Sequence, residues 1–64
     1  MRNNLKAKRN EKALKQPELA FMANCSVTYI SLIENNHVVP AKKMRQQLAG
    51  ILECEEEDLF PALY

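Results

Sequence analysis

Few side chains in this 64-residue sequence could carry out catalysis or hold a metal ion. His37 is the only histidine, and there is no serine, histidine and acid set, no pair of catalytic carboxylates and no phosphate-binding loop. Zinc would need three or four ligands, and Cys25, Cys54 and His37 are too few and too widely spaced. We therefore expect no enzyme activity, no metal and no cofactor, and we interpret both cysteines as small buried side chains.

The chemistry that the sequence does offer is hydrogen bonding by uncharged polar side chains. Amide and hydroxyl groups recur at Gln16, Ser26, Thr28, Ser31 and Asn35, and no Lys or Arg interrupts this stretch. Side chains of this kind can donate or accept hydrogen bonds with many kinds of partner, so their role depends on how the fold positions them.

Such side chains need rigid elements to position them, and the composition favours helices throughout. Leu, Ala, Lys, Glu and Gln are strong helix formers and dominate a chain that has one glycine and three prolines. The apolar spacing and the capping residues predict five helices, at about 4–13, 17–23, 27–34, 41–52 and 56–60. We expect an all-α fold in which residues 1–64 form a single domain with a thin core.

Residues 16–34 meet the requirements of a helix-turn-helix. This motif needs a small residue where the second helix crosses the first, a left-handed residue in the turn, and apolar residues on the inner face of the second helix. Ala20, Asn24, Cys25, Ile30 and Ile33 supply the small residue, the turn, an apolar anchor after it and the inner face. The apolar side of the first helix is expected at Leu19, Ala20, Met22 and Ala23.

Charge is unevenly distributed along the chain although the net charge is only +1. Residues 1–15 carry +5 and residues 41–54 carry +2, whereas residues 16–40 carry −2 and residues 55–64 carry −4. A molecule with a basic and an acidic end is suited to meeting a polyanion with one end only. No stretch has the length and apolarity of a signal peptide or a membrane span, so we expect a cytoplasmic protein.

On these residues the sequence resembles the Xre/Cro repressor family of helix-turn-helix regulators, whose DNA-binding domain is lambda-repressor-like. The family pattern has an Arg in the first helix, then Gln-x-x-Leu-Ala, a turn, Ser-x-x-x-Ile-x-x-x-Glu and a later Pro. It is matched by Arg9, Gln16, Leu19, Ala20, Ser26, Ile30, Glu34 and Pro40. The resemblance runs without gaps from about Leu5 to Phe60, and implies a compact five-helix domain that binds double-stranded DNA sequence-specifically and regulates transcription as a repressor.

The resemblance also implies roles for single residues. Arg9 and Glu34 would pair and tie the first helix to the end of the third, and Gln16 would bond a phosphate and support a base-reading neighbour. The helix 27–34 would lie in the major groove, with Val27, Thr28, Ser31 and Leu32 facing the bases. The expected DNA-binding residues are Lys6, Lys15, Gln16, Ser26, Val27, Thr28, Tyr29, Ser31, Leu32, Asn35 and Lys42.

Several positions depart from the family pattern. Lys15 stands where the family favours a Ser or Thr cap, which predicts a helix that frays more easily or a lysine that reaches a phosphate. Asn24 and Asn36 replace common glycines, and Asn tolerates the same left-handed backbone. Lys42 and Arg45 occupy positions that are usually apolar, which reduces an already thin core.

The expected recognition helix lacks the side chains that read bases most strongly. No Arg, Lys, Gln or Asn lies between Val27 and Glu34, so bidentate hydrogen bonding to guanine or adenine is not possible from this helix. Either sequence readout is weak, or Gln16 and the shape of the DNA assist it. The same apolar character leaves open a second hypothesis, a helix-turn-helix fold used as a protein-binding module, for example an antitoxin or an anti-repressor.

Two further questions stay open from the sequence. Tyr29 either stacks on the DNA or covers the core. Leu63 and Tyr64 form either a frayed tail or part of a dimer seam, and the cost of exposing apolar ends favours the seam. We expect a symmetric homodimer, at least on DNA, because one such domain reads only a few base pairs.

Overall fold

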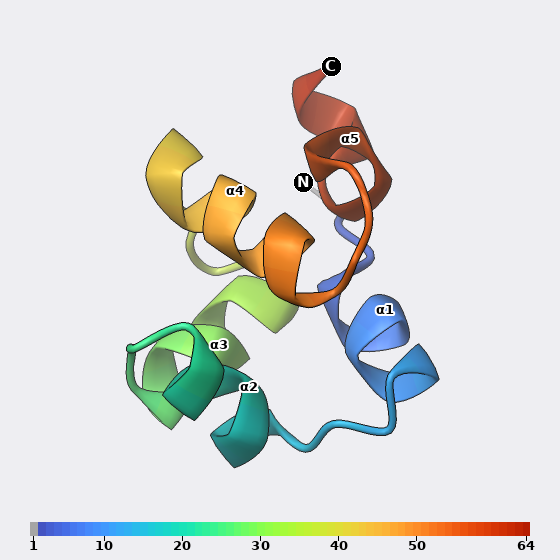
Figure 1. Cartoon of the computed structure of the whole chain (residues 1–64). Coiled ribbons are helices and arrows are strands. Elements are labelled where there is room, and N and C mark those ends of the chain that lie inside the picture. The colour runs from blue at the N-terminus through green and yellow to red at the C-terminus, as the bar shows by residue number, and fades with distance from the viewer. Residues whose placement is uncertain (1) are drawn as a thin grey trace.

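The computed structural model describes residues 2–64, which form five α-helices followed by one short 3-10 helix (Figure 1). The helices are α1 (Leu5–Glu11), α2 (Gln16–Met22), α3 (Val27–Glu34), α4 (Lys42–Ile51) and α5 (Glu56–Leu59), and η1 (Pro61–Leu63) is the 3-10 helix. No strand occurs within residues 2–64, and the expected all-α fold is confirmed. The helix ends differ from the expected ranges by two residues at most, and α3 coincides with 27–34.

The core draws on all five α-helices because each contributes one apolar side to a common centre. Its completely buried members include Leu5 of α1, Leu19 of α2, Ile30 of α3, Leu48 of α4 and Leu59 of α5. Ala20, Ala23, Ile33, Ala49, Leu52 and Phe60 complete it. Burial of this apolar surface is the main force that holds such short helices in place.

One expectation for α2 is wrong. Met22 was expected on the apolar side that faces the core, but its side chain is 52% exposed. The neighbouring Phe21 is 87% exposed. The buried side of α2 is formed by Leu19, Ala20 and, just after the helix, Ala23. Residues at these spacings lie on one side of a helix, whereas Phe21 and Met22 lie on the other side.

Four helices end in the same way, with a left-handed residue that is not glycine. These residues are Ala13 (φ 56°), Asn24 (φ 55°), Asn36 (φ 63°) and Glu53 (φ 55°), one after each of α1 to α4. After α2, the N–H of Asn24 donates to the Phe21 carbonyl at 3.1 Å and the N–H of Cys25 donates to the Ala20 carbonyl at 2.9 Å. This pair of bonds defines the Schellman motif, and it recurs after α1, α3 and α4.

The two cysteines follow two of these left-handed residues. Cys25 and Cys54 are both free, half-buried and packed against the core. Burial raises the pKa of both thiols, so the less reactive protonated form is favoured. Within residues 2–64, no three His, Cys, Asp or Glu side chains are grouped closely enough to hold a metal ion.

Asn3 and Asn4, which we call the clasp, hydrogen-bond the start of the chain to the end of α3 and to α5, respectively. The Asn4 N–H donates to the Leu59 carbonyl at 2.8 Å, and Asn4 Nδ2 donates to the Asp58 carbonyl at 2.9 Å. Asn3 Oδ1 accepts the N–H of Leu5 at 2.9 Å and so caps the first turn of α1. Figure 1 accordingly shows the segment that leads into α1 running beside α5.

Arg45 links α4 to the end of the chain. Its Nη1 donates to the Pro40 carbonyl at 2.9 Å, and its Nε lies 3.4 Å from Glu56 Oε1. The Tyr64 hydroxyl donates to the same Glu56 oxygen at 2.9 Å, and this hydrogen bond raises the pKa of Tyr64. At this usually apolar position Arg45 makes polar contacts, but its buried Nε has no hydrogen-bond partner within residues 2–64. Lys42 is exposed.

None of the helices in residues 2–64 is long and apolar enough to cross a membrane.

Candidate nucleic-acid interface

The helix-turn-helix is formed by α2 and α3, which pack against each other at one end of the molecule (Figure 1). Ala20 is 2% exposed and has the small side chain that a close crossing of the two helices requires. Asn24 adopts the left-handed conformation of the turn, and Cys25 packs against the core directly after it. On α3, Ile30 and Ile33 are completely buried. The turn and the inner face of α3 thus have the arrangement that the sequence pattern predicted.

A buried ion pair fixes the orientation of α3 relative to α1. Arg9 Nε donates to Glu34 Oε2 at 2.6 Å, and Arg9 Nη2 donates to Glu34 Oε1 at 3.2 Å. The Glu34 side chain is only 3% exposed. Arg9 Nη1 also donates to the Leu14 carbonyl at 2.8 Å, so the guanidinium group holds the loop before α2 as well. A two-point contact of this kind restrains direction as well as distance.

Gln16 completes this group at the start of α2. Its Nε2 donates to Glu34 Oε1 at 3.0 Å, so the Glu34 carboxylate accepts bonds from both Arg9 and Gln16. An amide nitrogen carries two hydrogens, and the second is left for another acceptor. Gln16 is half-buried, which places this donor at the surface. The three side chains connect α1, the start of α2 and the end of α3.

The outward face of α3 consists of two apolar and two hydroxyl-bearing side chains. Val27 and Leu32 are 40% and 37% exposed, Thr28 is exposed and Ser31 is half-buried. Asn35 Nδ2 donates to Ser31 Oγ at 3.3 Å, which connects the end of the helix to this face. The face therefore carries short, uncharged side chains.

The other sequence-predicted residues divide into positioning and exposed groups. Ser26 caps α3 by accepting the Tyr29 N–H at 3.0 Å, and Tyr29 is half-buried and packs against the core. Lys6, Lys15 and Lys42 are exposed, and no hydrogen bond or ion pair of their side chains occurs within residues 2–64. Of the two roles that the sequence left open for Tyr29, stacking on DNA or covering the core, the packing matches the second.

Sequence reasoning missed the part that Asn3 plays at the far end of α3. Asn3 Nδ2 donates to the Ile33 carbonyl at 2.8 Å and to Asn36 Oδ1 at 3.0 Å. The contact spans about thirty residues, and a local pattern of apolar spacing carries no signal of it. The Ile33 carbonyl also accepts the Asn36 N–H at 3.0 Å, so Asn3 adds a second hydrogen bond in the last turn of α3.

Comparison with known proteins agrees with this geometry. A family profile described as Helix-turn-helix matches residues 5–59, which is most of the chain. The chain belongs to the Xre/Cro, lambda-repressor-like helix-turn-helix family. A relative in this comparison is the ImmF control region 10 kDa protein of Bacillus phage phi105, which is 39% identical over 51 residues. The match covers 80% of this chain and 57% of that relative's length.

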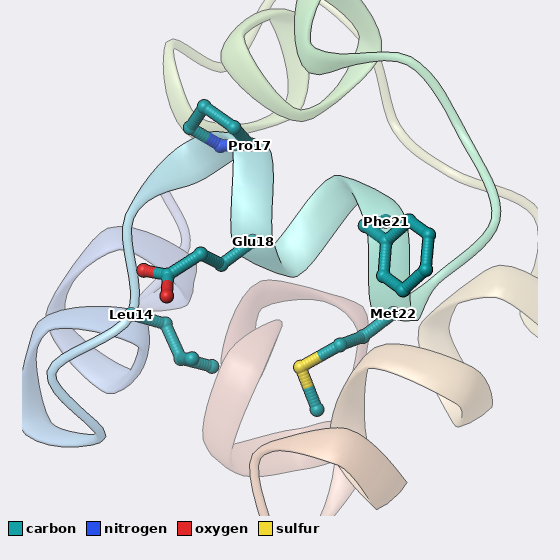
Figure 2. Close-up of a pocket in the computed structure, with 5 residues that line it drawn as sticks. All are labelled: Leu14, Pro17, Glu18, Phe21 and Met22. Atoms are coloured by element: carbon teal, nitrogen blue, oxygen red, sulfur yellow. The ribbon is translucent and has the colours of Figure 1, made fainter.

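This family member also exposes an apolar surface on the outer side of α2. Leu14, Pro17, Glu18, Phe21 and Met22 line a shallow, open pocket of about 420 Å³. Figure 2 shows Leu14 and Met22 pointing toward one another, with the Glu18 carboxylate above Leu14 and the Phe21 ring above Met22. We call these five residues the α2 patch. Nothing in the helix-turn-helix pattern itself requires exposed apolar residues here.

Proposed function

We propose that this protein is a transcriptional regulator that binds double-stranded DNA sequence-specifically through α3, and that it acts as a repressor. The observation that carries the proposal is that α3 is held rigidly on one side and exposed on the other. Its inner face is held by Ile30, Ile33 and the buried Arg9–Glu34 pair, while its outer face is free of contacts with the core. An exposed helix face on a rigid support suits insertion into the major groove of B-DNA.

The side chains around α3 support contact with the DNA backbone. Gln16 has one amide hydrogen left for a phosphate, and Asn35 lies just beyond the end of α3. Lys6, Lys15 and Lys42 are exposed cations, and Ser26 starts the recognition helix. Contacts of these types orient a protein on the duplex without reading its sequence.

The relative from Bacillus phage phi105 supports a regulatory role, because its name assigns it to a control region. Repression follows in the simplest way if bound protein occludes a promoter. This part of the proposal is tested by placing a selected site within a promoter and measuring transcription in a purified system. Transcription should fall as the protein saturates the site, and an increase would show an activator instead.

The DNA-binding proposal predicts two distinct classes of variant. Thr28→Ala and Leu32→Ala should change which duplexes are selected from a random pool while leaving the melting temperature almost unchanged. Lys6→Ala, Lys15→Ala and Lys42→Ala should weaken binding to all duplexes alike, and each should reduce the salt slope by about one if it touches a phosphate. If Thr28→Ala selected the same motif as wild type, the assignment of the groove-facing side would be wrong.

A symmetric homodimer on a two-fold related site is the form in which we propose that the protein acts. The supporting observation is the exposure of two large apolar side chains after α5: Leu63 is 39% exposed and Tyr64 is 64% exposed. The Tyr64 hydroxyl donates to Glu56, and this hydrogen bond supports an ordered end of the chain that a second copy can contact. Two copies multiply both affinity and discrimination.

A second candidate function is a protein-binding module, such as an antitoxin or an anti-repressor, and the α2 patch favours it. Phe21 is almost completely exposed, and Glu18 has no ion-pair partner within residues 2–64. The matching occupant is a segment of a partner protein with an apolar side chain and an adjacent cation. A salt titration separates the two functions, because DNA binding weakens steeply with salt through counterion release, whereas an apolar protein interface does not.

A further inference from the structure

We propose that the protein selects its DNA sites mainly through the 5-methyl groups of thymine, which Val27 and Leu32 contact. The inference rests on the proposed function, and it names the chemistry by which α3 distinguishes one site from another. Thymine is the one base that presents a methyl group in the major groove. The sites would therefore be rich in T·A pairs at the positions that face these two side chains.

The order of side chains around α3 supports this assignment. With about 100° of rotation per residue, the outward face runs from Val27 through Ser31 and Thr28 to Leu32, an arc of about 140°. Val27 and Leu32 thus form the two edges of the face, and the hydroxyl groups lie between them. Both apolar side chains are more than a third exposed, whereas Ile30 and Ile33 on the opposite side are completely buried.

The spacing along the helix also fits two separate bases. Five residues at about 1.5 Å each separate Val27 from Leu32 by about 7.5 Å along the helix axis. Base pairs rise by about 3.4 Å, so this distance spans roughly two base-pair steps. One helix can accordingly contact methyl groups on different base pairs with its two apolar edges.

The polar groups on the same face contribute to the selection, but less than the apolar side chains do. Ser31 Oγ already accepts a hydrogen bond from Asn35 Nδ2, which directs its own hydroxyl hydrogen elsewhere. Thr28 contributes one hydroxyl and a methyl group, and neither side chain has the two-point geometry that distinguishes guanine or adenine. Apolar contact is therefore the stronger source of discrimination on this face.

The test uses duplexes selected from a random pool, in which each thymine is replaced in turn by deoxyuridine. Deoxyuridine pairs like thymine but lacks the 5-methyl group. Burial of one carbon group of this size predicts roughly a fourfold loss of affinity at each contacted position, and roughly fifteenfold for two. Thymines outside the protected site serve as controls and should show no loss.

The variants Val27→Ala and Leu32→Ala identify which side chain contacts which base. At its own position, each variant should lose most of the difference between thymine and deoxyuridine, because the two changes remove the same contact. Val39→Ala is the matched control, since Val39 is an exposed valine, 52%, that lies outside α3 and outside the proposed dimer surface. It should retain the full difference, and unchanged melting of Leu32→Ala excludes a folding defect.

Three results would overturn the inference while leaving DNA binding intact. One is a selected motif without thymine, and another is a loss below twofold at every deoxyuridine position. The third is a thymine preference that persists unchanged in both Val27→Ala and Leu32→Ala. If the wild-type protein binds no duplex with salt dependence, the proposed function fails rather than this refinement of it.

Discussion

At the scale of single residues, the Arg9–Glu34 pair is the most consequential contact. Both side chains are almost completely buried. Arg9 and Gln16 donate the hydrogen bonds that satisfy both oxygens of the Glu34 carboxylate. Removing one member of such a pair leaves the other as an uncompensated buried charge. Removing one partner would therefore destabilise the protein by more than the net free energy with which the intact pair stabilises it.

We predict that Arg9→Ala lowers the free energy of unfolding by about 3 kcal/mol, the low end of the range for breaking a buried pair. A domain of this size has only a few kcal/mol of stability, so much of the protein should unfold at room temperature. Lys8→Ala is the control, because Lys8 makes only an exposed contact with Glu11 at 3.8 Å. Thermal melting measures both, and an Arg9→Ala melting point equal to that of wild type would contradict the role of the pair.

Sequence reasoning succeeded for residues whose role depends on local backbone or on a motif, and failed where the role depends on tertiary contacts. Asn24 and Asn36 were recognisable because few residues tolerate a left-handed backbone. Met22 was misplaced because α2 has apolar residues on both sides, so their spacing alone did not say which side faces the core. The contact of Asn3 with Ile33 joins distant segments and has no local signal.

At the scale of elements, two positions carry a residue that does not suit the local backbone conformation. Ala13 adopts a left-handed conformation that costs an alanine roughly 1 kcal/mol relative to glycine. The only glycine, Gly50, lies inside α4, where it weakens the helix and where an added Cβ would meet no atom within 4 Å. Glycine would suit position 13 better than alanine does, and alanine would suit position 50 better than glycine does.

We therefore predict that Ala13→Gly and Gly50→Ala each stabilise the protein, by about 0.5–1 kcal/mol. In a domain of this size, 1 kcal/mol corresponds to a rise of about 4–8 °C in melting temperature. Ala7→Gly in the middle of α1 is the control and should destabilise instead. Glu53 is a poorer target because its carboxylate accepts a bond from Lys12 at 2.8 Å, which lowers the pKa of Glu53. A lower melting temperature for Ala13→Gly would show that the left-handed backbone is not retained in solution.

The start of α2 offers a test in which stability and DNA affinity move in opposite directions. The Lys15 N–H donates to Glu18 Oε1 at 2.7 Å, but the lysine side chain has no acceptor for the N–H groups of the first turn. Lys15→Ser would add that acceptor and complete a reciprocal capping box, worth about 1 kcal/mol. The same change removes a cation that we assign to a phosphate.

We predict that Lys15→Ser raises the melting temperature and weakens binding to every duplex. Thermal melting and a binding titration at two salt concentrations measure the two effects. Lys43→Ser changes an exposed lysine of α4 and should alter neither quantity by a comparable amount. Unchanged affinity in Lys15→Ser would remove Lys15 from the set of phosphate contacts.

At the scale of the whole molecule, the first fifteen residues carry +5 and the last ten carry −4. The acidic residues Glu56, Glu57 and Asp58 stand in the first turn of α5, where the helix dipole stabilises negative charge. An acidic end repels DNA, so the protein should bind with α5 and η1 directed away from the duplex. This orientation leaves Leu63 and Tyr64 accessible to a second copy.

We predict two protein chains on each palindromic duplex, with half-sites about 10 base pairs apart. The seam is small, so the free protein should sediment mainly as a monomer, and dimers should form on the duplex. Tyr64→Ala should weaken the second binding step more than the first. A duplex with a single half-site is the control, and a one-to-one complex on the full palindrome at saturation would contradict the dimer.

The overall fold could be predicted because helix periodicity, capping residues and the helix-turn-helix pattern are all local in the sequence. The α2 patch could not be predicted, because an apolar residue on a helix reads as core until its neighbours in space are known. Phe21 and Met22 carry the same signal as Leu19, and only the packing of α2 against the core distinguishes them.

The clasp of Asn3 and Asn4 has a consequence for the order in which a ribosome delivers this chain. The carbonyl groups that Asn4 bonds belong to Asp58 and Leu59, so its partners are synthesised more than fifty residues after it. The helix-turn-helix can pack locally during translation, but α1 obtains its contacts with α5 only after residue 59 has left the exit tunnel. These hydrogen bonds, and with them the complete domain, can therefore form only late in synthesis.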